Sequence, residues 1–453
     1  MSNSVEIFVN KTKAGLLERT NDGEYLFTYD QKFLEESSEP ISLTMPLREE
    51  PYVSEVLHPF FDGLIPEGWL LDLAIRNWKL KQSDRFELLK VTCADAVGAV
   101  SVKPQSKTDL NSEKGISEKP ELFERGSCPN TNTEVCMISY KPLSKDQIEK
   151  HELYTAVSSN RMFGTKIGPK CVGISSDDLL NLGKVQIESG LNLTGVQKKM
   201  SLGLVYGEDK TAGNRLTYLK EGGEYILKPQ SEDFELLPET EHLCMKLAEV
   251  CKFDVPPCAL IPLKSGELAY LIKRFDRKKK KKFYQEDFCQ LSGKPTSEKY
   301  LSSVEKCAKL INSYCTNPKV NLALFYDIVL FNYIIGNADM HLKNYSLVKS
   351  SKNNQIELSP CYDYVSTKLL MPEDEEDTAL TINGKKSNIK VKDWVKLAEN
   401  MGLGDEHFHG RVKQFLKWEK KFYEVIGKSF VSPSHKEAFK EIIKENLRQL
   451  SEK

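Results

Sequence analysis

The sequence lacks the features that mark membrane, secreted and general nucleic-acid-binding proteins. None of the apolar runs among its 453 residues approaches the roughly 18 residues that suggest a membrane span. The N-terminus has no basic segment followed by a long apolar one, so we expect no signal peptide. The 64 Lys and Arg residues nearly balance the 65 Asp and Glu residues, and the net charge of −1 does not favour nucleic-acid binding. We therefore expect a cytoplasmic protein.

Internal repeats and clustered cysteines are also absent. No repeat with a period of about 20 to 50 residues is visible, which argues against a solenoid or a propeller. A chain of 453 residues can bury more than one hydrophobic core, so we expect two or three domains. The 11 cysteines are scattered, and Cys244, Cys251 and Cys307 lie within apolar patterns. In a cytosolic protein we expect the cysteines to be reduced and mostly to be packing residues.

Two polar loops carry the residues that are most informative about function. The apolar run 329–336 leads into residues 337–344 (NADMHLKN), which hold Asp339 and, five positions later, Asn344; Asp363 follows 19 residues after that Asn. A protein kinase needs these groups, because one carboxylate takes the proton of the attacking hydroxyl while an amide oxygen and a second carboxylate hold magnesium. The spacing of Asp339 and Asn344 equals that in the protein-kinase catalytic loop. Asp363 lies in Tyr-Asp-Tyr rather than Asp-Phe-Gly, so the chain is not an ordinary eukaryotic-type kinase.

Hydrophobic periodicity predicts both strands and helices along the chain. Period-two alternation indicates strands, and apolar positions three and four apart indicate helices. The predicted strands are 5–9, 11–16, 25–29, 96–100, 200–206, 224–228 and 267–272. One predicted helix begins near residue 68, and the others cover 84–92, 238–251, 297–315, 319–336 and 391–450. This mixture indicates an α+β fold.

Several further motifs occur in order along the chain. They are 63–69 (GLIPEGW), 195–202 (GVQKKMSL), 225–229 (YILKP), 274–277 (RFDR) and 285–290 (QEDFCQ). With these motifs and the two polar loops, nearly the whole chain resembles the HipA family of bacterial toxin serine/threonine kinases. The resemblance implies a bilobal, protein-kinase-like α+β fold with a small N-terminal α+β subdomain and an all-helical C-terminal lobe. It also implies that ATP and Mg²⁺ are the cofactors.

The resemblance divides the chain into five segments. They are an N-terminal HipA- or HipS-like subdomain at 1–104, a polar linker at 105–130, an insert at 131–185, a kinase N-lobe with the phosphate loop at 186–275, and a mostly helical C-lobe with the catalytic and metal loops at 276–453. In three-gene versions of the toxin system, the N-terminal unit is a separate small protein that inhibits the kinase. Here it is fused, and both an inhibitory and a structural role stay open.

Candidate nucleotide-binding residues lie in three places. A glycine lets the backbone approach phosphates and lysines add positive charge, although an ordinary turn is the alternative interpretation. The expected phosphate loop consists of Thr194, Gly195, Val196, Gln197 and Lys198. Lys228 ends a predicted strand, where it would reach the α- and β-phosphates and could pair with Glu241. The resemblance assigns binding of the adenine edge to the segment between the lobes, which is Ile272, Lys273, Arg274 and Phe275.

The two polar loops receive their roles from the chemistry of kinases. Asp339 would be the base that orients the substrate hydroxyl, and Asn344 and Asp363 would bind magnesium. Lys343 is a candidate for contact with the transferring phosphate. His341 is placed among the ATP-binding residues, and we prefer a loop-packing role for it to a catalytic one.

The phosphate loop departs from the family pattern. Many members carry a serine there whose autophosphorylation ejects the loop and switches the kinase off. The corresponding positions in this chain are Asn192 and Thr194. Asn192 cannot accept a phosphate, so Thr194 is the candidate for autophosphorylation, with Ser189 and Ser201 as alternatives.

The insert at 131–185 departs from the family pattern as well. It resembles a zinc-ribbon-like insert of some relatives (HipT-type), whose four ligand positions here would include Cys136, Ser139, Thr155 and Ser158. A structural zinc site needs four ligands, so we expect a degenerate insert without metal. The residues expected to keep its fold by packing are Tyr140, Leu143, Tyr154, Met162 and Phe163.

Two charged runs have more than one interpretation. The basic run 277–282 is expected to be a solvated hairpin, with contact to DNA or tRNA as the alternative. The acidic run 373–377 is expected to be an exposed loop, which could repel nucleic acid or recognise a basic substrate segment.

The leading hypothesis is an ATP- and Mg²⁺-dependent serine/threonine protein kinase that acts as the toxin of a bacterial type II toxin–antitoxin system. The resemblance implies that it phosphorylates an aminoacyl-tRNA synthetase and so arrests translation. It also implies a helix-turn-helix (HipB-like) antitoxin as partner, through which operator DNA would be reached indirectly, and no membrane partner. Two alternatives stay open, namely a kinase-fold binding protein or co-repressor with little activity, and a small-molecule kinase.

Overall fold

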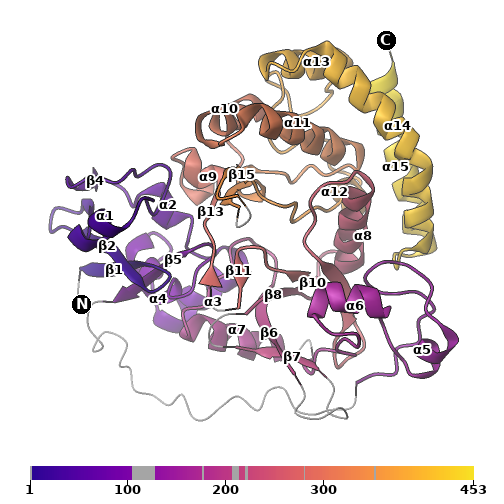
Figure 1. The fold of residues 1–453 in the computed structure, drawn as a ribbon, viewed down its shortest axis with the longest axis horizontal. Helices are drawn as coiled ribbons and strands as arrows, with labels where there is room; N and C mark the ends of the chain where they lie inside the picture. The colour runs from indigo at the N-terminus through magenta and orange to yellow at the C-terminus, as the bar shows by residue number, and fades with distance from the viewer. Residues whose placement is uncertain are drawn as a thin grey trace.

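The computed structural model describes residues 3–104, 128–175, 178–206, 214–219, 223–279, 281–350 and 353–452. Positions 105–127, which make up most of the predicted linker, lie outside the described residues. The described part has antiparallel sheets in its first two thirds and mainly helices in its last third (Figure 1). The predicted α+β fold class is therefore confirmed.

The N-terminal unit is an antiparallel sheet with short helices packed on it. Its strands are β1 (Ser4–Val9), β2 (Thr12–Arg19), β3 (Tyr25–Tyr29), β4 (Tyr52–Ser54) and β5 (Val100–Pro104), in the order β4-β3-β2-β1-β5. Its helices are α1 (Gln31–Glu36), α2 (Pro59–Asp62), α3 (Gly68–Trp78) and α4 (Arg85–Thr92). Strand alternation turns Val5 and Ile7 inward, where they join a core with Phe61.

The strand predicted at 96–100 is wrong. Gly98 has φ +76°, a left-handed conformation that does not fit a strand, and its amide donates to Asp276 Oδ2 at 3.1 Å. Residues 96–99 therefore bend toward the segment that carries Asp276, and the strand begins only at Val100.

A second antiparallel sheet occupies the middle of the chain. The insert contributes α5 (Lys145–Glu149) and α6 (Ala156–Phe163), and α7 (Leu179–Glu188) follows. The strands are β6 (Met200–Val205), β7 (Arg215–Tyr218), β8 (Tyr225–Lys228), β9 (Cys258–Pro262) and β10 (Leu268–Lys273), in the order β7-β6-β8-β10-β9. Helix α8 (Leu237–Val250) connects β8 to β9 and packs on β9 and β10. All five residues expected to hold the insert together are buried, which confirms that expectation.

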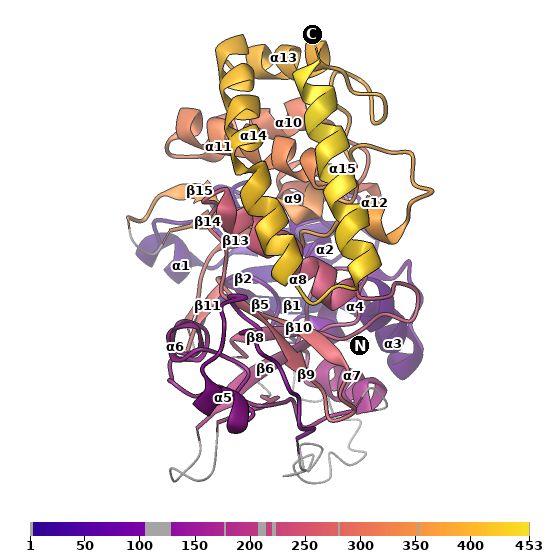
Figure 2. The same cartoon turned by 90° about the vertical axis from the view of Figure 1, so that its right-hand side faces the viewer.

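The C-terminal part surrounds the long buried helix α11. Its strands are β11 (Arg277–Lys278), β12 (Lys281–Lys282), β13 (Gln285–Asp287), β14 (Ser346–Lys349) and β15 (Ile356–Leu358). Its α-helices are α9 (Phe288–Leu291), α10 (Val304–Tyr314), α11 (Pro318–Ile334), α12 (Thr367–Leu370), α13 (Val391–Asn400), α14 (Asp405–Lys428) and α15 (Pro433–Ser451), and its 3-10 helices are Thr296–Glu298 and Leu342–Asn344. Helices α14 and α15 lie side by side (Figure 2). Among the described residues, no helix has the length and apolar character needed to cross a membrane.

The helix predicted at 297–315 begins later than expected. Ser303 caps α10, because its hydroxyl accepts from the amide of Lys306. A 3-10 helix at Thr296–Glu298 and a turn at residues 299–300 lie before it, and the carbonyl of Lys299 accepts from the amide of Leu342 at 3.1 Å.

Buried ion pairs join the N-terminal unit to the basic run 277–282. Arg277 donates to both carboxylate oxygens of Asp95, at 2.7 and 2.8 Å, and Lys282 lies 3.2 Å from the same carboxylate. The basic run 277–282 therefore includes a hairpin, β11–β12, as one interpretation predicted. It is not simply solvated, because Arg277 and Lys282 are directed into this interface.

Asp95→Ala is expected to lower the free energy of unfolding by about 3–5 kcal/mol, because it removes the carboxylate that accepts two hydrogen bonds from the buried Arg277. Urea denaturation of the full chain measures the change. The control is Lys13→Ala, which removes an exposed ion pair with Glu6 and should cost about 1 kcal/mol or less. Equal losses in the two variants would contradict the expectation.

The cysteines differ in part from the prediction. Cys128 and Cys171 form a disulfide, whereas the other nine cysteines are free and buried. The expectation of packing residues holds for those nine, and the expectation of reduced thiols is wrong for the pair at the edge of the insert.

Candidate active site

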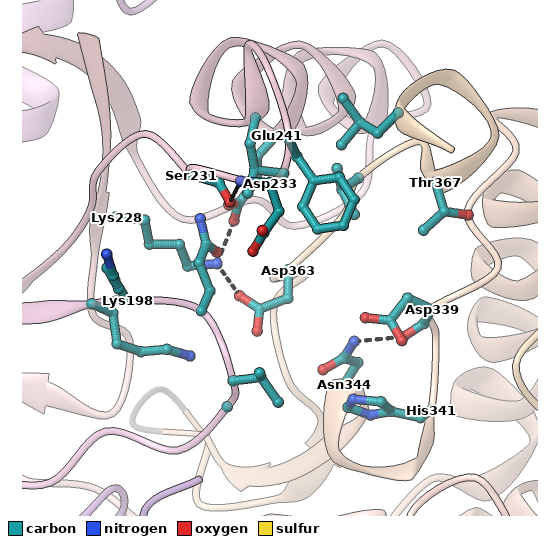
Figure 3. A pocket seen from close by; sticks show the side chains of 18 of the residues that line it. Lys198, Lys228, Ser231, Asp233, Glu241, Asp339, His341, Asn344, Asp363 and Thr367 are labelled. Carbon is teal, nitrogen blue, oxygen red and sulfur yellow. Dashed lines mark hydrogen bonds and ion pairs between the residues drawn. The ribbon is translucent and has the colours of Figure 1, made fainter. Parts of the chain in front are cut away.

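A cavity of about 720 Å³ receives residues from every major part of the chain. The phosphate loop and the end of β8 line one side, and the catalytic loop and Asp363 line the other (Figure 3). The N-terminal unit adds Glu67 and Trp69. Segments separated by more than a hundred residues in sequence thus meet at one site, as they must in a site built from several loops.

The predicted phosphate loop lies along the cavity. All five of its predicted residues, from Thr194 to Lys198, line it together with Lys199. Gly195 has φ +103°, a conformation open to glycine and rarely to other residues. Lys199 hydrogen-bonds to the carbonyl of Thr194, and Lys198 pairs with Glu232 at 2.6 Å across the cavity mouth. The loop thus presents backbone and lysine charge to the cavity, which suits an anionic ligand.

The phosphate loop also rests on the N-terminal unit. A Cβ atom at Gly68 would lie 2.6 Å from the carbonyl oxygen of Val196, so only glycine fits there. Asn192, the residue at the family's usual acceptor position, is buried and hydrogen-bonds to the carbonyl of Leu64. Thr194 lines the cavity, and its autophosphorylation stays a prediction.

Lys228 connects the two sides of the cavity. Its ammonium lies 2.6 Å from Glu241 Oε1 on α8 and 2.5 Å from Asp363 Oδ1 (Figure 3). Burial opposes the charge of Lys228, but the two carboxylates outweigh it and hold its pKa above the ordinary value. Burial would also raise the pKa of Asp363, yet Lys228 and Lys199 lower it to about 2. Asp363 is therefore ionised, whereas burial raises the pKa of Glu241 to about 7.

Hydrogen bonds within the predicted catalytic loop, residues 337–344, fix its conformation. Gly336, with φ +67°, ends α11 and turns the chain into the loop. The amide of Asp339 donates to Asn337 Oδ1 at 3.1 Å, and Asn344 Nδ2 donates to the carbonyl of Asp339 at 2.8 Å. The Asp339 carboxylate accepts from the hydroxyl of Tyr300 at 2.7 Å, and burial raises its pKa. The two residues predicted as base and metal ligand are thus directly linked.

Lys343 connects the predicted catalytic loop to neighbouring segments of the protein. Its ammonium donates to Asp287 Oδ2 at 2.9 Å and to the carbonyl of Gly63 at 3.2 Å, and Glu67 lies 3.8 Å away. Burial opposes its charge, but Asp287 and Glu67 hold its pKa above the ordinary value. These contacts favour a bracing role over the predicted contact with the transferring phosphate.

His341 is a neutral packing residue in this loop. Burial, followed by the charge of Lys299, lowers its pKa to about 3. Its ring meets that of Tyr300 edge to face at 4.9 Å, and Nδ1 has no hydrogen-bond partner among the described residues. The geometry agrees with the loop-packing interpretation.

The predicted adenine-binding segment lies outside the cavity. Ile272, Lys273, Arg274 and Phe275 are absent from its lining. The Arg274 guanidinium is paired with Asp276 at 2.8 and 2.6 Å, and the Phe275 ring packs on that of Tyr362. These four residues do not line the cavity, and binding of the adenine edge by their backbone stays a prediction.

Sequence reasoning missed several residues that line the site. Tyr300, Lys299 and Glu67 belong to it, as does the loop 229–234 after β8. Glu67 lies within the motif 63–69, which indicated the family but did not assign a role to this residue. Nothing in the local sequence distinguishes Tyr300 from other tyrosines.

Asn344 and Asp363 fit a magnesium ion by the chemistry of their donors. Mg²⁺ takes oxygen ligands and commonly uses one or two protein groups plus phosphates and water. Asn344 uses its amide nitrogen on Asp339, which leaves its oxygen on the side of Asp363 (Figure 3). Within the described ranges, no group of three or more His, Cys, Asp or Glu residues could hold a metal ion.

Two family models match the chain. Residues 191–422 match the HipA-like C-terminal domain, and residues 5–103 match the HipA N-terminal domain. Putative kinase Y4mE of Sinorhizobium fredii is 26% identical over 404 residues, which cover 86% of this chain and 84% of the relative. In Haemophilus influenzae, a putative kinase is 27% identical over 331 residues (66% of this chain, 92% of the relative). An uncharacterized protein of the same organism is 29% identical over 102 residues (22% of this chain, 92% of the relative).

HipA of Shewanella oneidensis is similar in both sequence and fold. The sequence named serine/threonine-protein kinase toxin HipA is 24% identical over 370 residues, which cover 77% of this chain and 71% of the relative. A solved structure of the toxin–antitoxin complex of HipA, HipB and operator DNA from that organism matches with a TM-score of 0.68 and 19% identity. The match covers 98% of this chain and 96% of the other, so the whole fold is shared.

Proposed function

This chain belongs to the HipA family of serine/threonine kinases, and we propose that it is an ATP- and Mg²⁺-dependent protein kinase acting as the toxin of a bacterial toxin–antitoxin pair. The observation that carries the proposal is that Lys228, Asp339, Asn344 and Asp363 line one cavity, where Lys228 contacts Asp363 and Asn344 contacts Asp339. These are the groups that phosphoryl transfer requires.

Each residue has a role that follows from its contacts. Lys228, held by Glu241 and Asp363, is placed to neutralise phosphate charge, with the phosphate loop opposite. Asp339 accepts the proton of the substrate hydroxyl. Asn344 and Asp363 would hold magnesium, which would neutralise the charge of the phosphates. His341 packs against the catalytic loop.

By family resemblance, the substrate is a serine or threonine of an aminoacyl-tRNA synthetase in the cytosol, whose modification arrests translation. The partner is a helix-turn-helix antitoxin like the HipB that accompanies the Shewanella oneidensis HipA. This chain reaches operator DNA only through that antitoxin. The burial of Arg277 and Lys282 against Asp95 supports the indirect route, because it removes charge from the basic run.

The test is transfer of the labelled γ-phosphate of ATP into proteins of a bacterial lysate with magnesium, by wild type and Asp339→Asn side by side. A labelled band that only the wild type produces supports the proposal, and its identification gives the substrate. A labelled metabolite with no labelled protein would indicate a small-molecule kinase. ATP binding without any transfer would indicate a kinase-fold binding protein or co-repressor.

The first segment, 1–104, is proposed to be a fused HipS-like unit with a structural role. The two Haemophilus influenzae relatives support fusion, because one match is about as long as residues 5–103 and the other about as long as the rest. Glu67 and Trp69 at the cavity, and Gly68 against the phosphate loop, support a part in building the site. A folded Asp95→Ala variant with activity several-fold above wild type would instead show that the unit inhibits.

Residues 131–185 are proposed to be a degenerate zinc-ribbon-like insert between the linker (105–130) and the two lobes (186–275 and 276–453). The Thr155 amide donates to Cys136 Sγ at 3.3 Å, and the Ser158 hydroxyl donates to Ser139 Oγ at 3.0 Å. Burial raises the pKa of Cys136, but bonds from Ser139 and Thr155 outweigh it and lower that pKa. The four residues at the presumed ligand positions thus lie together. Hydrogen bonds link them at the place where cysteines would bind zinc in the relatives.

The triple variant Ser139→Cys/Thr155→Cys/Ser158→Cys is expected to bind about one zinc ion per chain, because it supplies four thiolates at one point. Metal content after dialysis, measured by elemental analysis, checks this. The same variant with Cys136→Ser added is the control and should retain far less. A triple variant that stays metal-free while folded would contradict the assignment of these four positions.

A further inference from the structure

Tyr300 is the side chain that touches the proposed base. Its hydroxyl donates to Asp339 Oδ1 at 2.7 Å, within the range of a strong hydrogen bond to a carboxylate. Asp339 has two carboxylate oxygens, and among the described residues no other side chain donates a hydrogen bond to them. Oδ1 is therefore occupied by Tyr300. Oδ2 is left for a ligand in the cavity that both residues line.

The ring of Tyr300 is held from several sides. His341 meets it edge to face at 4.9 Å, and the ammonium groups of Lys299 and Lys386 lie 5.5 and 5.9 Å from its centre. The residue is nevertheless 39% exposed, so it lies at the mouth of the cavity. A ring packed in this way delivers its hydroxyl to a defined place.

The backbone that carries Tyr300 is fixed as well. Lys299 pairs with Glu67 at 2.8 Å, and its carbonyl accepts from the amide of Leu342 in the catalytic loop. The amide of Thr296 donates to Asp62 Oδ2 at 2.8 Å. The segment 296–300 is thus anchored both to the N-terminal unit and to the loop that bears the base.

We propose that Tyr300 is a positioning residue, whose hydroxyl fixes one oxygen of Asp339 so that the other meets the acceptor hydroxyl. The inference rests on the proposed role of Asp339 as base. A carboxylate free to rotate about its Cβ–Cγ bond would spend time in orientations that cannot take the proton, and fixed geometry of reacting groups is worth large factors in rate. The phenol supplies that fixation without adding charge beside the metal ligands.

The anchoring of Tyr300 distinguishes a positioning role from that of a plug, meaning a side chain that only fills the site of the substrate hydroxyl. Such a side chain would leave the site when the substrate binds. Tyr300 is instead carried by a segment anchored through Glu67, Asp62 and Leu342, with its ring packed on His341. Displacing it would break contacts that have no part in substrate binding.

The test is Tyr300→Phe in the full chain, which removes the hydroxyl and keeps the ring. Initial rates of labelled γ-phosphate transfer into the acceptor proteins of a bacterial lysate are measured against ATP concentration. We expect the rate at saturating ATP to fall about 10-fold, as for loss of a hydrogen bond to a charged group. The KM for ATP and the affinity for ADP should stay within about twofold, because the phosphate loop and Lys228 are untouched.

Tyr326→Phe is the matched control, because it removes a buried tyrosine hydroxyl whose bond goes to the carbonyl of Trp394, away from the cavity. It should leave the transfer rate within about twofold. A Tyr300→Phe rate equal to wild type, or higher as for a displaced plug, would overturn the inference. So would an equal loss of ADP affinity, which points to a role in the shape of the cavity. If wild type itself transfers no phosphate, the proposed function fails first, and that result is separate.

Discussion

Asp339→Asn is expected to lower the rate of phosphate transfer by about 10²–10⁴ while ATP still binds. The amide has nearly the shape of the carboxylate, and the backbone bonds of residue 339 to Asn337 and Asn344 do not depend on the side chain. The substitution therefore removes the proton acceptor and little else. The loss should appear in kcat, with the affinity for ATP within a few-fold of wild type.

Rapid-quench measurement of transfer and titration of ATP binding by calorimetry separate these two effects. Asp393→Asn is the matched control, because Asp393 is also buried and paired, with Lys385 and Asn383, but does not line the cavity. Its transfer rate should stay within about twofold of wild type. An Asp339→Asn enzyme that keeps more than a tenth of the wild-type rate would remove Asp339 from the role of base.

Lys228→Met is expected to abolish measurable transfer and to destabilise the protein by about 3–5 kcal/mol. The ammonium lies between Glu241, which is buried, and Asp363. Without it, two carboxylates share a cavity wall with no cation between them, and the phosphates lose the charge that would neutralise them. Urea denaturation gives the free energy of unfolding, and γ-phosphate transfer gives the activity.

The double variant Lys228→Met/Glu241→Gln distinguishes the two losses. The second substitution replaces the buried carboxylate with a neutral amide, so it should recover a large part of the lost stability. It restores no cation, so activity should stay absent. Recovery of transfer in the double variant would mean that Lys228 serves the fold and not the nucleotide.

The sequence was informative wherever chemistry restricts residue type and spacing. The interval between Asp339 and Asn344 reflects a loop that must bring a base and a metal ligand together, and the structure links the two by one hydrogen bond. The long apolar helix α11 and the amphipathic α8 were predicted within a few residues, because their apolar residues mark their buried positions.

The contacts of Tyr300 could not be predicted in this way. Its partner lies 39 residues further along the chain, and the contact depends on a turn at residues 299–300 that periodicity placed in a helix. The pairing of Arg274 could not be predicted from the sequence either. Its guanidinium pairs with Asp276, two residues on, and Asp276 also accepts from the amide of Gly98 in the N-terminal unit. Local sequence does not show which of two partners a charged side chain will choose.

The cavity takes residues from Glu67 to Glu376, and this span bears on how the enzyme is made. Contacts between such distant positions form only after most of the chain is available, and they form slowly because a large loop must close. During synthesis, a ribosome-bound chain that ends before residue 363 lacks both the metal ligand and one partner of Lys228. A chain that ends before residue 363 is therefore expected to lack phosphate-transfer activity.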